Sequence, residues 1–295
     1  MAWLQLSVEV SGDRVEVAAE TLSDAGALSV TYEDAADEPI LEPGVGEHPV
    51  WSATRVVALF PEDCDTSGIR QRLRAALHDA AIEVRVERLE DRDWSGTWRD
   101  SFHAMRFGAR LWVVPSDESP AGADAVVVRM DPGLAFGTGT HATTALCLEW
   151  PDANPPEGLE VIDYGCGSGI LAIAAARLGA CRVRAVDIDP QALQATRENA
   201  RRNGVDEELR VIFPGALDAR PAGLLIANIL ANPLIELAET LAGQVSPGGH
   251  IVLSGILDEQ AGDVMAAYRR WFDFRDPVQR EGWVLLEGIK RQGEK

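Results

Sequence analysis

Hydrophobic and polar residues are arranged along the first ninety positions in a pattern that predicts a small α+β unit. Alternation with a period of two predicts strands, and a period near 3.6 predicts helices. The predicted strands cover residues 3–10, 27–34, 51–60 and 82–90, and the predicted helices cover 13–26 and 65–80. This order is ferredoxin-like. The charged residues lie on solvated faces and form no catalytic constellation, so we expect residues 1–90 to be a recognition domain.

The next segment carries an aromatic stripe. Trp94, Trp98 and Phe102 recur at every fourth position, which places them on one side of a helix. Such a stripe is more typical of packing against a domain than of direct contact with a substrate. Residues 91–108 are therefore expected to form a helical linker.

Residues 109–295 are expected to form a second domain, in which the pattern changes from Gly158 onward to strands that alternate with helices. Runs such as 223–228 and 250–255 are apolar on both faces, as parallel strands covered by helices must be. Residues 272–291 predict two strands joined by a short turn. The expected fold class is α/β, a doubly wound sheet with an antiparallel edge hairpin, preceded by the small ferredoxin-like α+β domain.

A glycine-rich turn follows the first strand of this sheet. Asp163 ends the strand, and Gly165, Gly167 and Gly169 precede a helix. Glycines allow a sharp turn and close approach of a ligand to the free N–H groups of a helix N-terminus. Asp187 stands about twenty residues later, after the next strand, where a carboxylate can accept both hydroxyls of an adenosine ribose.

Two adenosine ligands compete for this turn. A dinucleotide fingerprint would have glycine where this chain has Ile170, and Asp163 would face a pyrophosphate of like charge. S-adenosylmethionine (SAM) has no phosphate and carries an ammonium and a sulfonium, so an acid beside the turn is favourable. The residues favour SAM. A nicotinamide oxidoreductase and a SAM-binding regulator without catalysis are the alternatives outside the methyltransferase class.

Two further polar residues are candidates for chemistry. Asn228 ends another strand, at the edge where an open α/β sheet binds its ligands. Class I amine methyltransferases place an N/D-P-P-Y/F motif here, whereas Asn228 is followed by Ile-Leu-Ala and lacks the aromatic residue. His141 lies in a second glycine-rich stretch, 131–144, and is a candidate either for a general base or for a structural hydrogen bond.

Composition narrows the possible partners. The 295 residues carry a formal charge of −20, which argues against sequence-independent binding of nucleic acid. No window approaches the roughly 18 apolar residues of a membrane span, and the N-terminus does not resemble a signal peptide, so a cytoplasmic protein is expected. The four cysteines lie far apart, without a histidine at metal-ligand spacing, and indicate neither a metal site nor a disulfide framework.

Several motifs together resemble one family. "DPGLAFGTGTHATT", the D-x-G-x-G-x-G turn, "VDID", "ANILA" and the final "REGWVLLEGIKR" are similar to the ribosomal protein L11 methyltransferase family (PrmA), over essentially the whole chain. The resemblance implies a cytoplasmic SAM-dependent protein-lysine N-methyltransferase. Its substrates would be lysine side-chain and N-terminal amines of ribosomal protein L11, free before ribosome assembly, with no direct contact to nucleic acid or membrane.

The resemblance also implies roles for individual residues. Asn228 would orient the target amine, and the segment that contains Phe136 and Gly137 would close over the cofactor. The implied cofactor-binding residues are Phe136, Gly137, Thr144, Asp163, Gly165, Gly167, Gly169, Asp187 and Asn228. A methyltransferase acting on lysines of an electron-transfer flavoprotein, or on RNA, is the alternative within the class, and the N-terminal domain and the acidic surface argue against both.

Overall fold

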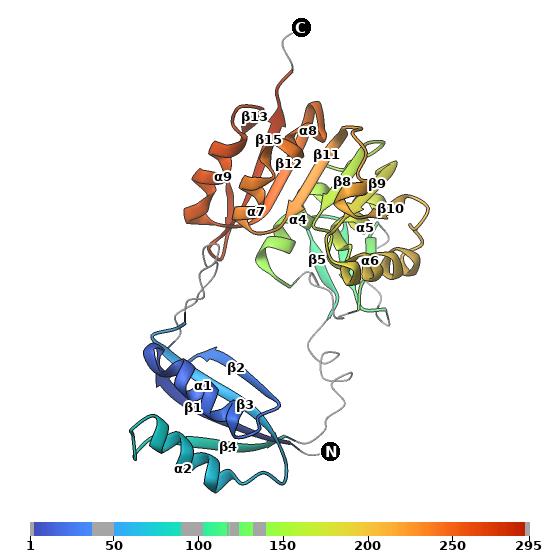
Figure 1. The fold of residues 1–295 in the computed structure, drawn as a ribbon. Helices are drawn as coiled ribbons and strands as arrows, with labels where there is room; N and C mark the ends of the chain where they lie inside the picture. The colour runs from blue at the N-terminus through green and yellow to red at the C-terminus, as the bar shows by residue number, and fades with distance from the viewer. Residues whose placement is uncertain are drawn as a thin grey trace. The chain divides into compact units, whose positions relative to one another are not determined.

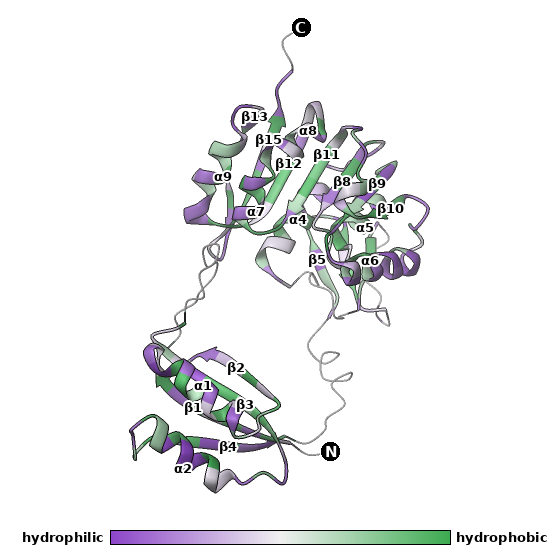
Figure 2. Cartoon of the chain, viewed as in Figure 1, coloured by the Kyte–Doolittle hydropathy of each residue, from purple (hydrophilic) through white to green (hydrophobic). Residues whose placement is uncertain are grey.

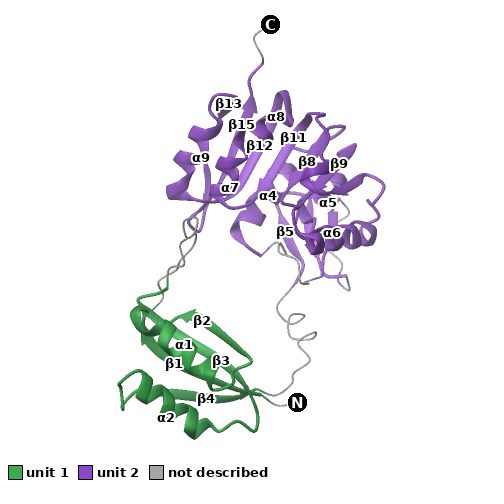
Figure 3. Ribbon diagram, in the orientation of Figure 1, with its two compact units in different colours: residues 1–94 green, residues 95–295 purple. Residues whose placement is uncertain are grey.

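A computed structural model describes residues 3–36, 50–89, 103–116, 118, 124–131 and 140–292. Contacts within the chain divide it into two compact units, residues 1–94 and 95–295, which are coloured separately in Figure 3. The boundary lies close to the predicted end of the recognition domain. Each unit has its own hydrophobic core and is described by itself.

Unit 1 is one antiparallel sheet with helices packed on one face (Figure 1). Its elements are β1 (Trp3–Ser11), α1 (Val15–Asp24), β2 (Ser29–Asp34), β3 (Ala53–Pro61), α2 (Thr66–Ala76) and β4 (Val84–Leu89), and a short 3-10 turn, Gly12–Arg14, precedes α1. The strand order β2-β3-β1-β4 is that of a ferredoxin-like fold, as predicted. Leu6 and Val8 of β1 are buried beneath the helices, and Glu9 is exposed, which is the alternation that a half-covered sheet requires.

Unit 2 is built around an eight-stranded sheet with the order β10-β9-β8-β11-β12-β15-β13, in which β14 pairs with β15. Its strands are β8 (Glu160–Tyr164), β9 (Arg182–Val186), β10 (Leu209–Ile212), β11 (Ala222–Asn228), β12 (Val245–Leu257), β13 (Phe272–Phe274), β14 (Val278–Arg280) and β15 (Trp283–Lys290). The pairs among β8 to β12 are parallel, and β15 is antiparallel to β12. The doubly wound sheet with an antiparallel edge is thus confirmed.

Helices cover both faces of this sheet (Figure 1). They are α4 (Ala142–Ala153), α5 (Ile170–Arg177), α6 (Pro190–Arg202), α7 (Ala231–Glu236), α8 (Ala238–Gly243) and α9 (Ala261–Tyr268), with 3-10 turns at Pro214–Ala216 and Asp258–Gln260. Val161 packs against the side of α4, α5 and α6, and its neighbour Ile162 packs against the side of α7, α8 and α9. The inner residues of the central strands β8, β11 and β12 are therefore mostly hydrophobic on both faces (Figure 2), because helices shield both faces from water.

A three-stranded sheet precedes α4. It consists of β5 (Met105–Phe107), β6 (Leu111–Val114) and β7 (Val126–Arg129) in the order β5-β6-β7. The buried carboxylate of Asp152, near the end of α4, accepts hydrogen bonds from the backbone N–H groups of Ala109, Arg110 and Leu111. These bonds fix the turn between β5 and β6 against α4.

Two expectations need correction, and a third lies outside the described residues. The predicted helical linker, 91–108, does not reach 108, because residues 105–107 form β5, which pairs with β6. The proposed stripe of Trp94, Trp98 and Phe102 lies outside the described residues. The C-terminal segment 272–291 forms three strands where two were expected, and β15 lies within the sheet, between β12 and β13.

Candidate active site

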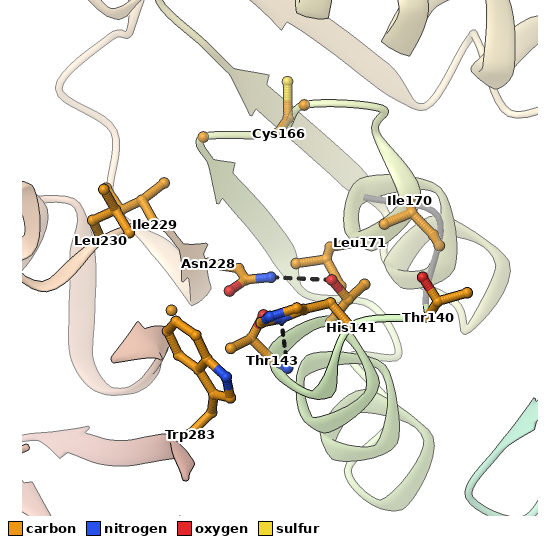
Figure 4. Close-up of a pocket in the computed structure, with 14 residues that line it drawn as sticks. Thr140, His141, Thr143, Cys166, Ile170, Leu171, Asn228, Ile229, Leu230 and Trp283 are labelled. Carbon is orange, nitrogen blue, oxygen red and sulfur yellow. Dashed lines mark hydrogen bonds between the residues drawn. The ribbon is translucent and has the colours of Figure 1, made fainter. Parts of the chain in front are cut away.

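A cavity of about 670 Å³ opens at the carboxyl ends of β8 and β11, where the sheet reverses its order. This is the edge at which doubly wound sheets bind ligands, and the volume suits a small organic molecule. Figure 4 shows the side chains that surround it. The described lining residues are Thr140, His141, Thr143, Thr144, Gly165, Cys166, Gly167, Ile170, Leu171, Asn228, Ile229, Leu230, Gly255 and Trp283.

The turn after β8 can be built only with glycine. Gly165, Gly167 and Gly169 have φ values of 81°, 53° and 82°, in the region that side chains with a Cβ rarely adopt. A Cβ at Gly165 would lie 2.3 Å from Cγ2 of Ile229, and one at Gly169 would lie 2.8 Å from Cγ2 of Thr196. The turn therefore forms the floor of the cavity, and α5 begins directly after it.

Asp187 joins this turn to the end of β9. Its Oδ2 accepts a hydrogen bond from the N–H of Gly167 at 2.9 Å, and its Oδ1 accepts one from the N–H of Asp189 at 3.0 Å. Two apolar side chains beside it are unusually exposed, Ile188 at 79% and Phe213 at 48%. They follow the adjacent strands β9 and β10, so they provide apolar surface next to the carboxylate.

Asp163 is placed differently from the prediction. It is not among the described residues that line the cavity, and it is buried beneath the turn. Its Oδ2 accepts a hydrogen bond from the N–H of Ala172 in α5 at 2.9 Å, and its Oδ1 is buried without a hydrogen-bond partner. The pKa of Asp163 is raised to about 7. Burial is the largest cause, the hydrogen bond from the N–H of Ala172 acts to lower the pKa, and the negative charge of Asp187 acts to raise it.

His141 caps α4. Its Nδ1 lies 3.4 Å from the N–H of Thr143 and 2.8 Å from the hydroxyl of the same residue. An Nδ1 that accepts the backbone N–H carries no proton, so the proton of the neutral ring is on Nε2. In this tautomer neither ring nitrogen is free to accept a proton. This geometry favours the structural role for His141 over a general base.

Asn228 and Thr144 face each other at the end of β11. The Nδ2 of Asn228 donates to Oγ1 of Thr144 at 3.4 Å (Figure 4). This assignment of the amide leaves Oδ1 of Asn228 able to accept a hydrogen bond from a ligand. The following residue, Ile229, packs onto Gly165, and its backbone passes so close to Gly255 that a Cβ there would lie 2.4 Å from the Ile229 carbonyl oxygen.

Most of the predicted site residues meet in one place. Thr144, Gly165, Gly167 and Asn228 line the cavity, Gly169 and Asp187 belong to the turn around it, and Asp163 lies beneath the turn. Phe136 and Gly137 lie outside the described residues.

Sequence reasoning missed several residues at this edge. They are Ile188, Phe213, Leu230, Gly255 and Trp283. An apolar residue within two positions of the end of a strand was the available signal for Ile188 and Phe213. For Trp283 the signal was Gly282 directly before it, since glycine supplies the positive φ of a tight hairpin turn. Cys166 also lines the cavity, and burial raises the pKa of its thiol, so it stays neutral.

Comparison with known proteins gives a consistent result. The family model described as ribosomal protein L11 methyltransferase (PrmA) matches residues 2–291. A ribosomal protein L11 methyltransferase of Methylococcus capsulatus is 54% identical over 291 residues, 98% of this chain and 99% of the relative. One from Azotobacter vinelandii is 49% identical over 292 residues, 99% of this chain and 100% of the relative.

A solved structure of a ribosomal protein L11 methylase from Lactobacillus delbrueckii subsp. bulgaricus is also similar. It superposes with a TM-score of 0.59 at 34% identity and covers 65% of this chain and 100% of that chain.

Proposed function

This chain belongs to the ribosomal protein L11 methyltransferase family, whose members use S-adenosylmethionine, and from that premise we propose how its own residues perform the reaction. The enzyme transfers methyl groups to lysine side-chain and N-terminal amines of ribosomal protein L11. It acts on L11 that is free before ribosome assembly. The observation that carries the proposal is the cavity in which Asn228 faces the glycine turn after β8.

The residues around the turn fit the cofactor. The turn from Gly165 to Gly169 admits a ligand to contact distance because no Cβ projects from its glycines. Asp187 retains lone pairs that can accept the ribose hydroxyls, since each carboxylate oxygen is bonded to one backbone N–H. Ile188 and Phe213 would cover the two faces of the adenine, which explains why apolar side chains are exposed at this point.

The carboxyl group of Asp163 lies below the same turn. When ionised, it would favour the cationic methionine end of the cofactor, although its side chain does not line the cavity among the described residues. Phe136 and Gly137 are proposed to close over the cofactor from the opposite wall, with Thr144 beside them.

The target amine would enter beside Asn228. When bound, SAM supplies a methyl carbon whose bond to the sulfonium breaks as the bond to the amine nitrogen forms, after which the nitrogen loses a proton. The Oδ1 of Asn228 accepts a hydrogen bond from the amine and thereby directs its lone pair, while Thr144 holds the amide in place. Positioning of this kind supplies most of the acceleration.

The cavity must select the neutral amine, because a free lysine has a pKa of about 10.4 and an α-amine about 8. No carboxylate, lysine or arginine occurs among the described lining residues, and much of the lining is apolar. Desolvation in such surroundings lowers the pKa of an amine. The site therefore favours the unprotonated form, and no dedicated base is required for methyl transfer.

The N-terminal unit is proposed to recognise L11. Its four-stranded sheet has one face that the described helices leave uncovered, and the chain as a whole carries a charge of −20. A strongly negative protein attracts a lysine-rich partner over long distances. Membership of the family disfavours the flavoprotein-directed alternative.

Mass spectrometry of purified L11, incubated with this protein and SAM, tests the proposal. We expect mass gains in steps of one methylene, and a loss of roughly a hundredfold or more in rate for Asn228→Ala, because positioning is worth several powers of ten. Asn154→Ala is the matched control, since Asn154 caps the end of α4 outside the cavity. No mass gain, with cofactor binding confirmed by calorimetry, would exclude L11 as the substrate. Full activity of Asn228→Ala would exclude its role in orientation.

A further inference from the structure

The loop after Asn228 cannot provide an aromatic residue for the target amine. The aromatic position of the usual motif corresponds here to Ala231, the first residue of α7, which is 1% exposed and packs into the core. Ile229 is turned toward the glycine turn, since its Cγ2 lies where a Cβ of Gly165 would be. Leu230 is the remaining side chain at the mouth of the cavity, and it carries no ring.

An indole reaches the cavity from the C-terminal hairpin instead. Glu281 and Gly282 have φ values of 52° and 81°, and positive φ at both central residues is the pattern of a tight hairpin turn. Trp283 is the first residue of β15, opposite Leu257 at the end of β12. The turn therefore delivers Trp283 to the carboxyl edge of the sheet, where it lines the same cavity as Asn228 (Figure 4).

Two contacts connect the C-terminal hairpin to α4 and to its capping residue. The ring centroid of Trp283 lies 5.0 Å from that of His141, with an interplanar angle of 70°, an edge-to-face contact. Arg280, three residues earlier, donates to both carboxylate oxygens of Glu149 at 3.0 and 2.8 Å. Both bonds come from Nη2 of Arg280, and they tie the hairpin to the later half of α4, while the ring contact of Trp283 ties it to the capped start of the helix.

An aromatic ring face beside the target amine would stabilise the charge that forms there. Positive charge arrives on the amine nitrogen as it is methylated, and a methylated ammonium has few or no N–H groups left to donate. No carboxylate among the described lining residues balances this charge, but the indole ring of Trp283 is one of the groups that line the cavity. The face of an indole attracts such a cation, most strongly when water is excluded.

We propose that Trp283 contacts the side chain of the target amine and stabilises its methylated, positively charged nitrogen, replacing the aromatic residue that is missing after Asn228. The proposal rests on the proposed function, since it concerns the amine side of the same cavity. It assigns to Trp283 the retention of partly methylated product, and hence the number of methyl groups that one nitrogen receives.

Trp283→Phe and Trp283→Met form the decisive pair, because the two side chains have similar volumes and only phenylalanine has a π face. Methylation of L11 is followed by mass spectrometry for kcat, KM and the proportions of mono-, di- and trimethylated product, and SAM affinity is measured by calorimetry. Trp271→Met is the control, since Trp271 packs on the α9 side of the sheet and does not line the cavity.

We expect Trp283→Phe to retain kcat/KM within about threefold and Trp283→Met to lose it by about ten- to thirtyfold, as loss of a desolvated cation–π contact implies. The product of Trp283→Met should shift toward monomethylation, with SAM affinity unchanged. Equal behaviour of the two variants, or wild-type product proportions in Trp283→Met, would overturn the proposal.

A second measurement covers the case in which Trp283→Met does not fold. Site-specific incorporation of fluorinated tryptophans at position 283 weakens the π face and preserves the shape, so the degree of methylation should fall with each added fluorine. A degree of methylation independent of fluorination would overturn the proposal. Absence of L11 methylation by the unsubstituted enzyme, in contrast, would refute the proposed function itself.

Discussion

The two edges of the large sheet use charge in opposite ways. At the carboxyl edge, no carboxylate, lysine or arginine lines the cavity among the described residues, and none of these residues donates to Oδ1 of Asn228. At the amino edge of the same strands, Arg184 is 2% exposed yet bonds Asp218 at 2.7 Å and the backbone carbonyl of Arg220 at 2.7 Å. Its Nη2 also lies 3.5 Å from Glu160.

The two edges differ in whether their polar side chains face each other or face the cavity. At the amino edge, Arg184 forms ion pairs with Glu160 and Asp218, so opposite charges lie together within the chain, although Nε and Nη2 of Arg184 make no hydrogen bond. At the carboxyl edge, the N–H groups of Gly165, Gly167 and Gly169 are bonded within the chain, and Asn228 lines the cavity with an Oδ1 to which no described residue donates. Ion pairs within the chain thus lie at one edge of the sheet, and the cavity lies at the opposite edge.

The largest expected effect comes from one substitution made at both ends of β12. Gly255 and Gly248 both have positive φ, 83° and 76°. A Cβ at Gly255 would meet the backbone of Ile229 at 2.4 Å, whereas a Cβ at Gly248 would meet only the flexible end of Gln292. Gly255→Ala should lower the unfolding free energy by roughly 3 kcal/mol or more and displace Asn228, and Gly248→Ala by about 1 kcal/mol.

Urea unfolding and the methylation rate together measure this contrast. Equal losses of stability at the two positions, or full activity of Gly255→Ala at a temperature where it is folded, would show that the carboxyl edge is no more constrained than the amino edge. The backbone would then give no support for a difference between the two edges.

The next effect in size tests the amino edge. Arg184→Leu removes a buried cation from Asp218 and Glu160, and it should lower the unfolding free energy by roughly 2–4 kcal/mol. The rate of methylation per folded molecule should stay unchanged, because none of these groups reaches the cavity. Arg182→Leu is the matched control: Arg182 is 52% exposed, and its ion pair with Glu160 at 3.5 Å should contribute less than about 0.5 kcal/mol.

A change in kcat or KM for Arg184→Leu, measured where the variant is fully folded, would contradict the separation of the two edges. A small loss of stability would indicate that leucine packing compensates for the lost ion pairs, as replacement of buried ion pairs sometimes does.

Sequence patterns predicted the parallel strands and the glycine turn because burial on both faces and positive φ leave direct traces in residue type. They also predicted that Asn228 and Gly165 lie at the same site, since the strand ends of a doubly wound sheet meet at one edge. They could not place Trp283, because the register of a hairpin fixes which side chain reaches the cavity. Nor could they show that Asp163 lies beneath the turn, since its position depends on the packing of α5.

The smallest effect, and the most informative about the comparison, concerns Asp163, the buried carboxylate of the carboxyl edge. Burial raises its pKa to about 7 in the folded chain, above the unfolded value of about 3.9. A raised pKa means that the folded state gains stability from protonation below the unfolded pKa, and that this gain is lost as the pH rises to about 7. Asp163→Asn removes this dependence, so its stability relative to the wild type should rise between pH 4 and pH 7.

Cofactor binding should follow the opposite course. A cationic ligand above the turn favours the ionised carboxylate, so SAM affinity of the wild type should increase roughly tenfold as the pH rises through about 7, with release of a proton. Asp163→Asn should bind weakly and without this pH dependence, which calorimetry in two buffers of different ionisation enthalpy measures. If Asp163→Asn binds SAM as tightly as the wild type at every pH, the carboxylate serves only to hold Ala172 and the start of α5. Both edges would then use buried charge for structure alone, and the unmet oxygen of Asp163 would have no part in the chemistry.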